Sequence, residues 1–239
     1  MTQEQDRRDK LALGELAEDA AGFGVAELHL TRDLLIRPRA AMAAYDAEGS
    51  TAGGRYPRPL RYYLTLNGVY LLLLTFTGGL ERTFDQSGSD EMIRNLASWA
   101  GKSLDETRAD LDQWFSLLMV PIYTLTFAWP LYRLIRRWSP ADNRTDFNQT
   151  FTFLSLWTLY GLPFGLLIQF YPPLGNLGAA VSFLLIPIAY AVIGRGRWWR
   201  TRRGAWLKGI GLVVASVFLM VPVALLTWAL AVAAVKFLP

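Results

Sequence analysis

The chain offers few side chains that could carry out acid–base, nucleophilic or metal chemistry. It has 239 residues, no cysteine and a single histidine, His29. Disulfides, thiolate nucleophiles and a zinc site with the usual ligands are therefore not expected. The sequence contains no Walker loop, dinucleotide-binding glycine pattern or nucleophile–base pair. We expect no catalytic residue, no cofactor and no metal, so the protein is not predicted to be an enzyme.

Arginine and tryptophan residues suited to phosphate groups gather in two places. Tryptophan favours the membrane interface and arginine binds phosphate, so we predict contact with anionic lipid head groups or with a docking partner. The first group precedes an apolar segment and comprises Arg55, Arg58 and Arg61. The second group comprises Arg195, Arg197, Trp198, Trp199, Arg200, Arg202 and Arg203.

The apolar stretches contain no Asp, Glu, Lys, Arg or His. A carboxylate or histidine at membrane depth is typical of proton-coupled transporters, so that class is disfavoured. The neutral polar residues there include Asn67 and Gln169. Such groups suit hydrogen bonds between helices or to a substrate.

Proline and glycine residues occur within the same apolar stretches. Gly161 and Gly165 form a small-xxx-small pattern, which predicts close packing against another helix, inside the bundle or in a partner. Prolines in four stretches predict either hinges around a binding cavity or static kinks. These are Pro121, Pro163, Pro187 and Pro222.

Long apolar stretches bounded by basic clusters are typical of an integral membrane protein. Hydrophobic residues make up 52% of the chain, and its last 93 residues contain no acid. The predicted fold is an all-α polytopic membrane bundle of about five transmembrane helices. The predicted spans are residues 62–80, 114–132, 147–171, 177–194 and 209–235. A re-entrant pair over residues 147–194 would reduce the number to three.

The regions outside the spans are polar. Residues 1–61 are predicted to be a cytoplasmic N-terminal region, ahead of a transmembrane domain over residues 62–239. Helical periodicity over residues 11–36 predicts one or two amphipathic helices. Val25, Leu28, Leu34 and Leu35 form an apolar stripe, with Arg32 and Asp33 on the polar side. Residues 81–113 are predicted to be a polar helical loop, with one helix near residues 90–100 and another opened by a capping box at Ser103–Glu106.

Basic residues set the orientation. With the N-terminus inside, the cytoplasmic segments 1–61, 133–146 and 195–208 hold 19 of the 24 Lys and Arg residues. Basic loops stay cytoplasmic, so we predict a cytoplasmic N-terminus and a periplasmic or extracellular C-terminus in a bacterial inner membrane. The expected partners are anionic lipids rather than nucleic acid, because the basic residues lie beside apolar spans.

Three stretches in order resemble a bacterial integral-membrane family of unknown function. They are Thr31–Pro38 followed by Tyr45, Gly54–Tyr63, and Val120–Pro121 with the apolar run that ends at Arg133. Members usually carry an N-terminal zinc ribbon, which this chain lacks, and often histidines where this chain has Phe147–Thr150. The five-span layout is also similar to that of Yip-type membrane proteins, by topology alone.

These features favour a non-catalytic membrane protein, an interaction, assembly or accessory subunit with a membrane-protein partner or a second copy. The alternative is a permease or lipid-handling protein that uses the proline-containing spans. A third class, an enzyme acting at the bilayer surface, would depend on His29 or on the carboxylates of residues 85–112.

Overall fold

The computed structural model of the chain describes residues 24–76, 90–171 and 175–237. Its structure is 84% helix, and the described residues form no strand. The prediction of an all-α protein is therefore confirmed for these residues. Parts of the predicted elements lie outside them: the stripe before residue 24, the end of the span 62–80, and the loop over residues 77–89.

The helices follow one another along the chain with short connections. They are α2 (Val25–Ile36), α3 (Pro38–Glu48), α4 (Pro59–Phe76), α6 (Asp90–Ala100), α7 (Leu104–Tyr123), the π-helical turn η1 (Thr124–Ala128), α8 (Trp129–Arg136), α9 (Asn143–Phe170), α10 (Gly175–Ile193) and α11 (Arg202–Phe237).

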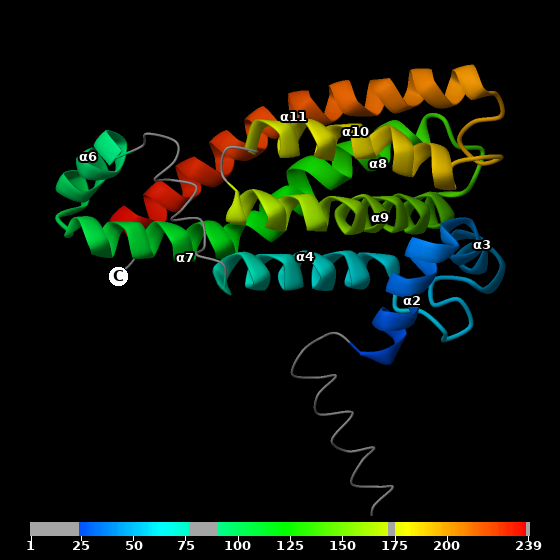
Figure 1. The fold of residues 1–239 in the computed structure, drawn as a ribbon, viewed down its shortest axis with the longest axis horizontal. Helices are drawn as coiled ribbons and strands as arrows, with labels where there is room; N and C mark the ends of the chain where they lie inside the picture. Colours follow the sequence, from blue (N-terminus) through cyan, green and yellow to red (C-terminus); the bar gives the residue numbers. More distant parts are fainter. Residues whose placement is uncertain (1–23, 77–89, 172–174, 238–239) are drawn as a thin grey trace, which may run out of the picture.

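Five long helical rods make up the body of the molecule and run along its long axis (Figure 1). They are α4, the α7–η1–α8 rod, α9, α10 and α11. Helix α4 packs on α9, α9 on α10, α10 on α11, and α11 on α7, whereas α4 and α7 barely touch. The rods therefore form an incomplete ring, with a weak contact between α4 and α7.

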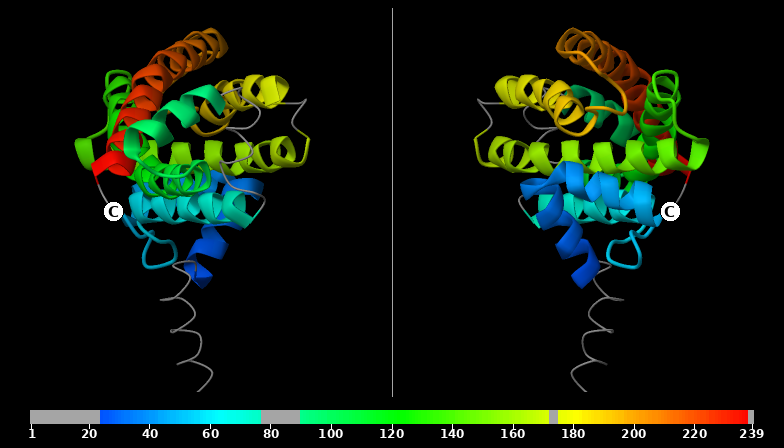
Figure 2. Two further views of the ribbon diagram at one scale, coloured as in Figure 1. Left: turned by 90° about the vertical axis from the view of Figure 1, so that its left-hand side faces the viewer. Right: turned by 90° about the vertical axis from the view of Figure 1, so that its right-hand side faces the viewer.

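The two ends of the bundle hold different connections. Helices α2 and α3 lie at the same end as the α8–α9 and α10–α11 connections, on the right in Figure 1. Helix α6 and the C-terminal part of α11 lie at the opposite end. Figure 2 shows the same bundle from each of these ends, with α2 and α3 on the α4 and α9 side.

Among the described residues, three helical segments are long and apolar enough to cross a membrane by length and composition: Leu104–Arg136, Asn143–Leu167 and Arg202–Phe237. A shorter apolar helix covers Ala180–Ile193. This agrees with a membrane protein. The polar helix after the capping box and the predicted span 114–132 form one rod, because α7 continues through η1 into α8.

Helix α7 begins and bends where its sequence dictates. The Ser103 hydroxyl accepts a hydrogen bond from the Glu106 amide, and the Glu106 carboxylate accepts from the Ser103 amide at 2.9 Å. The predicted capping box is thus confirmed. Pro121 lies inside α7, and the π-helical turn follows it from Thr124. The missing proline amide accounts for a local change of hydrogen-bond register at this point.

The predicted apolar stripe of α2 is wrong for Val25, Leu28 and Leu35, whereas Leu34 is buried as predicted. The structure buries Glu27, Leu30, Asp33 and Leu34. It leaves the side chains of Val25, Leu28 and Leu35 at least half exposed. The physical reason is that both carboxylates of the buried face have cationic partners from outside the helix, which hydrophobic periodicity does not register.

Candidate functional site

Asp33 is the centre of a buried charge cluster at the end of the bundle that carries α2 and α3. Its side chain is 1% exposed. The carboxylate accepts hydrogen bonds from the Tyr56 hydroxyl at 2.6 Å and from Arg55 Nη2 at 2.8 Å. Arg32 and Arg37 each donate two further hydrogen bonds to it. We call Asp33, Arg32, Arg37, Arg55 and Tyr56 the Asp33 cluster.

The cluster keeps the Asp33 carboxylate ionised. Burial acts to raise its pKa, but the hydrogen bonds donated by Tyr56 and by the neighbouring arginines outweigh burial, and the pKa lies well below its ordinary value. Burial and the hydrogen bond to Asp33 raise the pKa of Tyr56. A fully satisfied carboxylate at neutral pH has no proton to exchange, so the cluster fits a structural role.

Two other carboxylates of the N-terminal region hold predicted docking arginines. Glu27 lies 3.4 Å from Arg61 Nη2 and accepts from the Gly24 amide. Asp46, at the end of α3, pairs with Arg197 from the α10–α11 connection. These pairs connect α2 and α3 to the ends of α4 and α10. Arg61 and Arg197, like Arg55, therefore pair with carboxylates of the protein, although the side chains of Arg55 and Arg61 stay at least half exposed.

Five of the predicted arginines lie exposed at this end and pair with no carboxylate in the described parts of the chain. We call them the basic face: Arg58, Arg195, Arg200, Arg202 and Arg203. Trp206, which follows them in α11, is 64% exposed. This tryptophan was not among the predicted site residues, although it belongs to the same arginine- and tryptophan-rich segment.

Trp198 does not lie at the surface, which corrects its assignment as a head-group contact. It is 1% exposed. Its ring stacks on Tyr190 at 5.3 Å between centroids and meets Phe153 edge to face at 5.9 Å. Trp199 is half-buried and donates its indole N–H to the Tyr190 carbonyl. Both rings turn inward because the tight turn over residues 194–199 folds back onto α10.

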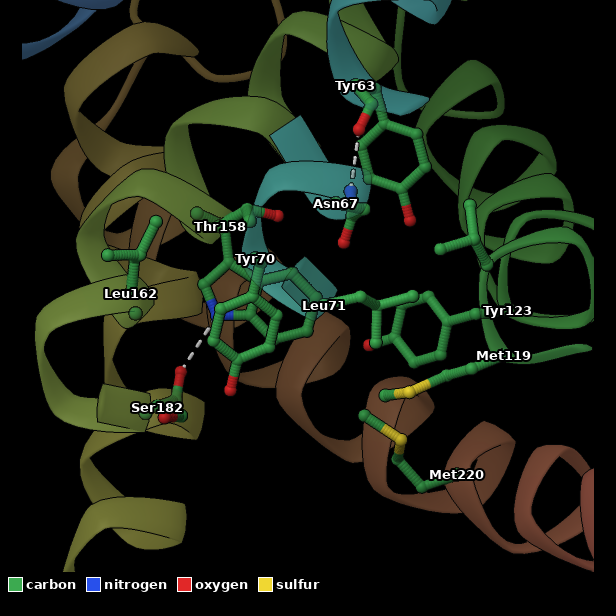
Figure 3. Close-up of a pocket in the computed structure, with 14 residues that line it drawn as sticks. Tyr63, Asn67, Tyr70, Leu71, Met119, Tyr123, Thr158, Leu162, Ser182 and Met220 are labelled. Atoms are coloured by element: carbon green, nitrogen blue, oxygen red, sulfur yellow. Dashed lines mark hydrogen bonds between the residues drawn. The ribbon is translucent and has the colours of Figure 1, made fainter. Parts of the chain in front are cut away.

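A half-open cavity of about 250 Å³ lies between α4, α7, α9, α10 and α11 (Figure 3). We call it the interhelical cavity. Its lining is aromatic, thioether and aliphatic, with a few neutral polar groups. The residues that line it include Tyr70, Leu71, Met119, Tyr123, Trp157, Gly161, Leu162 and Met220.

Several polar groups of the interhelical cavity already have protein partners. Trp157 donates its indole N–H to the Ser182 carbonyl at 2.9 Å, and the Asn67 amide donates to the Tyr63 carbonyl at 2.7 Å. The hydroxyls of Tyr70 and Tyr123 have no hydrogen-bond partner among the described residues. The cavity therefore offers two donors on an otherwise apolar surface.

The two glycines of the small-xxx-small pattern play different parts. A Cβ on Gly165 would lie 2.5 Å from the Tyr70 hydroxyl, so α9 and α4 approach closely there. A Cβ on Gly161 would meet nothing within 4 Å. Gly161 lines the interhelical cavity and does not seat a neighbouring helix, so helix packing belongs to Gly165 alone.

Other candidate residues show no assembled site. His29 is exposed on α2. The described residues contain no group of three His, Asp or Glu side chains that could hold a metal ion. Asp146, which was not predicted as a site residue, is buried at the start of α9 with no hydrogen bond to either carboxylate oxygen. The side chain of Gln169 lies outside the described residues.

Comparisons of the chain with protein-family models, with curated proteins and with solved structures find no match. The family resemblance therefore stays a prediction, and the function must be inferred from the chemistry of the site.

Proposed function

We propose that this chain is a non-catalytic, five-span membrane protein that serves as an interaction or accessory subunit of a bacterial inner membrane. Its N-terminal region and basic face lie in the cytoplasm, where they contact anionic lipids and a protein partner or a second copy. The observation that carries the proposal is the unequal distribution of charge between the two ends of the bundle.

The end that carries α2 and α3 also receives both basic connections. Residues 24–61, 133–146 and 195–208 together contain sixteen Lys or Arg and six Asp or Glu. At the opposite end, residues 90–113 and Lys236 supply four basic and six acidic residues. Because basic segments are retained in the cytoplasm, this asymmetry supports a cytoplasmic N-terminal region.

The arrangement of the rods supports five spans. Helices α4 and α10 lie beside α9, one of the three longer apolar helices, over most of its length, and α7 and α11 extend past all three toward the end that carries α6 (Figure 1). If α4 did not cross, the basic N-terminal region would lie on the same side as the acidic segment 90–113. Five crossings keep the three basic segments together on one side and leave the C-terminus on the other.

The basic face supports contact with lipid. Exposed arginines near a cytoplasmic membrane surface each gain about 1 kcal/mol from anionic lipids. The inward pairing of Arg55, Arg61 and Arg197 holds the N-terminal region rigid, and a rigid polar surface is suited to a protein partner.

Purification from native membranes in mild detergent tests the proposal. A homo-oligomer or a stoichiometric partner should co-purify. Replacing the four basic-face arginines of residues 195–203 with glutamine should reduce bound phosphatidylglycerol, with Arg133→Gln as a single-charge control elsewhere at the same end. A monomer that carries no partner would contradict the accessory role.

A further inference from the structure

We propose that the interhelical cavity binds one uncharged, membrane-dissolved lipid whose carbonyl oxygen accepts hydrogen bonds from Tyr70 and Tyr123. This site goes beyond the accessory role, because it gives the same chain a lipid-handling activity. It depends on the bundle being in a membrane but not on the basic face or on a protein partner, so the two proposals fail separately.

The size of the cavity suits a ring or a chain segment. A cavity of roughly 150 Å³ accommodates benzene, and pockets for drug-sized ligands begin near 300 Å³. The interhelical cavity, at about 250 Å³, lies between these. Tyr70 and Leu71 of α4 line it opposite Met119 and Tyr123 of α7 (Figure 3). Those two helices barely touch, so the cavity separates them.

The neutral lining of the cavity favours an uncharged ligand. Among the described residues, none of those that line it is Asp, Glu, Lys, Arg or His. A phosphate or ammonium group placed there would lose its hydration without gaining a counter-charge, which is strongly unfavourable. A phospholipid also keeps its head group at the bilayer surface, whereas Met119, Trp157 and Met220 lie near the middle of the α7–η1–α8 rod, of α9 and of α11.

The free donors select an oxygen acceptor. The indole of Trp157 and the amide of Asn67 already donate within the protein, whereas the Tyr70 and Tyr123 hydroxyls donate to none of the described residues. In an apolar environment an unpaired donor is costly. A carbonyl oxygen of an acylglycerol ester or of a quinone ring has two lone pairs, so it can accept a hydrogen bond from each hydroxyl. Its apolar body would contact the adaptable side chains of Met119 and Met220.

The bend of α7 holds Tyr123 in this position. Tyr123 is the last residue before the π-helical turn, and its ring stacks on Phe127 within that turn, at 4.4 Å between centroids. Phe127 packs in turn on Trp157. Single π-helical turns inside α-helices occur frequently at functional sites. The π-helical turn after Pro121 thus holds Tyr123 against Phe127, on the wall of the proposed ligand site.

Photocrosslinking in phosphatidylcholine proteoliposomes tests the site in the full-length protein. The probe is a diacylglycerol with a diazirine in one acyl chain, and adducts are mapped by peptide mass spectrometry. We expect saturable adducts on Met119, Leu162 and Met220. Unlabelled dioctanoylglycerol and decylubiquinone are the two competitors, which distinguish an ester from a ring carbonyl. Decane, which has no acceptor, should not compete.

Matched variants separate cavity binding from general contact with lipid. Gly161→Leu fills the cavity and should lower the saturable adducts at least tenfold. Gly68→Leu makes the same change on an exposed face of α4, where a Cβ meets nothing within 4 Å, and should leave them unchanged. Tyr70→Phe and Tyr123→Phe should each raise the half-saturating probe concentration about twofold to tenfold.

Two results would overturn the proposal. One is an adduct pattern in Gly161→Leu equal to that of the wild type and of Gly68→Leu. The other is failure of both carbonyl competitors, or competition by decane as strong as theirs. Partner recovery from Gly161→Leu, measured in parallel, reports on the accessory role independently.

Discussion

Two buried aspartates at the basic end have opposite surroundings. Asp33 accepts hydrogen bonds from three arginines and a tyrosine. Asp146 is equally buried, but neither carboxylate oxygen has a partner within hydrogen-bonding geometry among the described residues. Burial raises the pKa of Asp146 despite the nearby Ser139 hydroxyl and Arg136 charge. Asp146 lies in the first turn of α9, where the helix dipole favours a negative charge. Their carboxylates therefore contribute differently to stability, although sequence alone shows two similar residues beside basic segments.

Asp33→Asn should lower the free energy of unfolding by about 1 to 3 kcal/mol. The loss stays below that of a fully buried ion pair because the three arginines are about half exposed. Asp146→Asn should change it by less than about 1 kcal/mol, because the lost dipole interaction and the relieved desolvation oppose each other. Thermal unfolding in detergent measures both. Equal losses would contradict this account of the Asp33 cluster.

The same cluster predicts acid sensitivity. The pKa of Asp33 is depressed in the folded protein, so its contribution is fully present above the ordinary aspartate pKa of about 3.9. It is lost as the pH falls below that value toward the folded pKa. The midpoint of wild-type unfolding should therefore fall more steeply below about pH 4 than that of Asp33→Asn, and the two should run parallel above it. If the unfolding midpoints of the wild type and of Asp33→Asn fell equally with pH, Asp33 would not be the source of the acid sensitivity.

Glycine contacts determine how closely the helices approach one another. A Cβ on Gly209 of α11 would lie 2.9 Å from the Pro187 Cβ and 3.3 Å from its Cα. A Cβ on Gly211, two residues further along, would meet only the Trp138 ring at 3.9 Å. Pro187 thus takes part in tight packing of α10 on α11.

Gly209→Ala should destabilise the bundle by about 1 to 3 kcal/mol, because neither a proline ring nor a backbone atom can move aside easily. Gly211→Ala is the matched control. It makes the same change in the same helix and should be neutral or stabilising by up to about 1 kcal/mol. Unfolding curves of the two purified variants provide the comparison, and a neutral Gly209→Ala would rule out the tight crossing.

At the level of elements, apolar length and composition predicted the helices well. The Ser103 capping box fixed the start of α7, and charge-free runs marked the body of α9, α10 and α11. The buried face of α2 was not predictable from periodicity, since Asp33 is paired by Arg55 and Tyr56 from a later loop. The interhelical cavity was not predictable either, because its lining residues come from five helices and the sequence does not show which helices pack together.

The whole molecule is polarised along its bundle axis. The number of basic residues in each connecting segment can be read from the sequence. The fold then brings the basic segments 133–146 and 195–208 to one end, beside α2 and α3 (Figure 1). We propose that this end is cytoplasmic and that α4 and α10 cross the membrane together with the three longer helices.

Cysteine accessibility tests that claim most directly, because the chain has no native cysteine. Single cysteines are placed at exposed positions by Ala47→Cys and Thr201→Cys at the basic end and by Ser98→Cys at the opposite end. In intact cells, a membrane-impermeant maleimide should label Ser98→Cys alone, and should reach the other two only after permeabilisation. Labelling of Ala47→Cys together with Ser98→Cys in intact cells would contradict a crossing by α4, and labelling of Thr201→Cys there would contradict a crossing by α10.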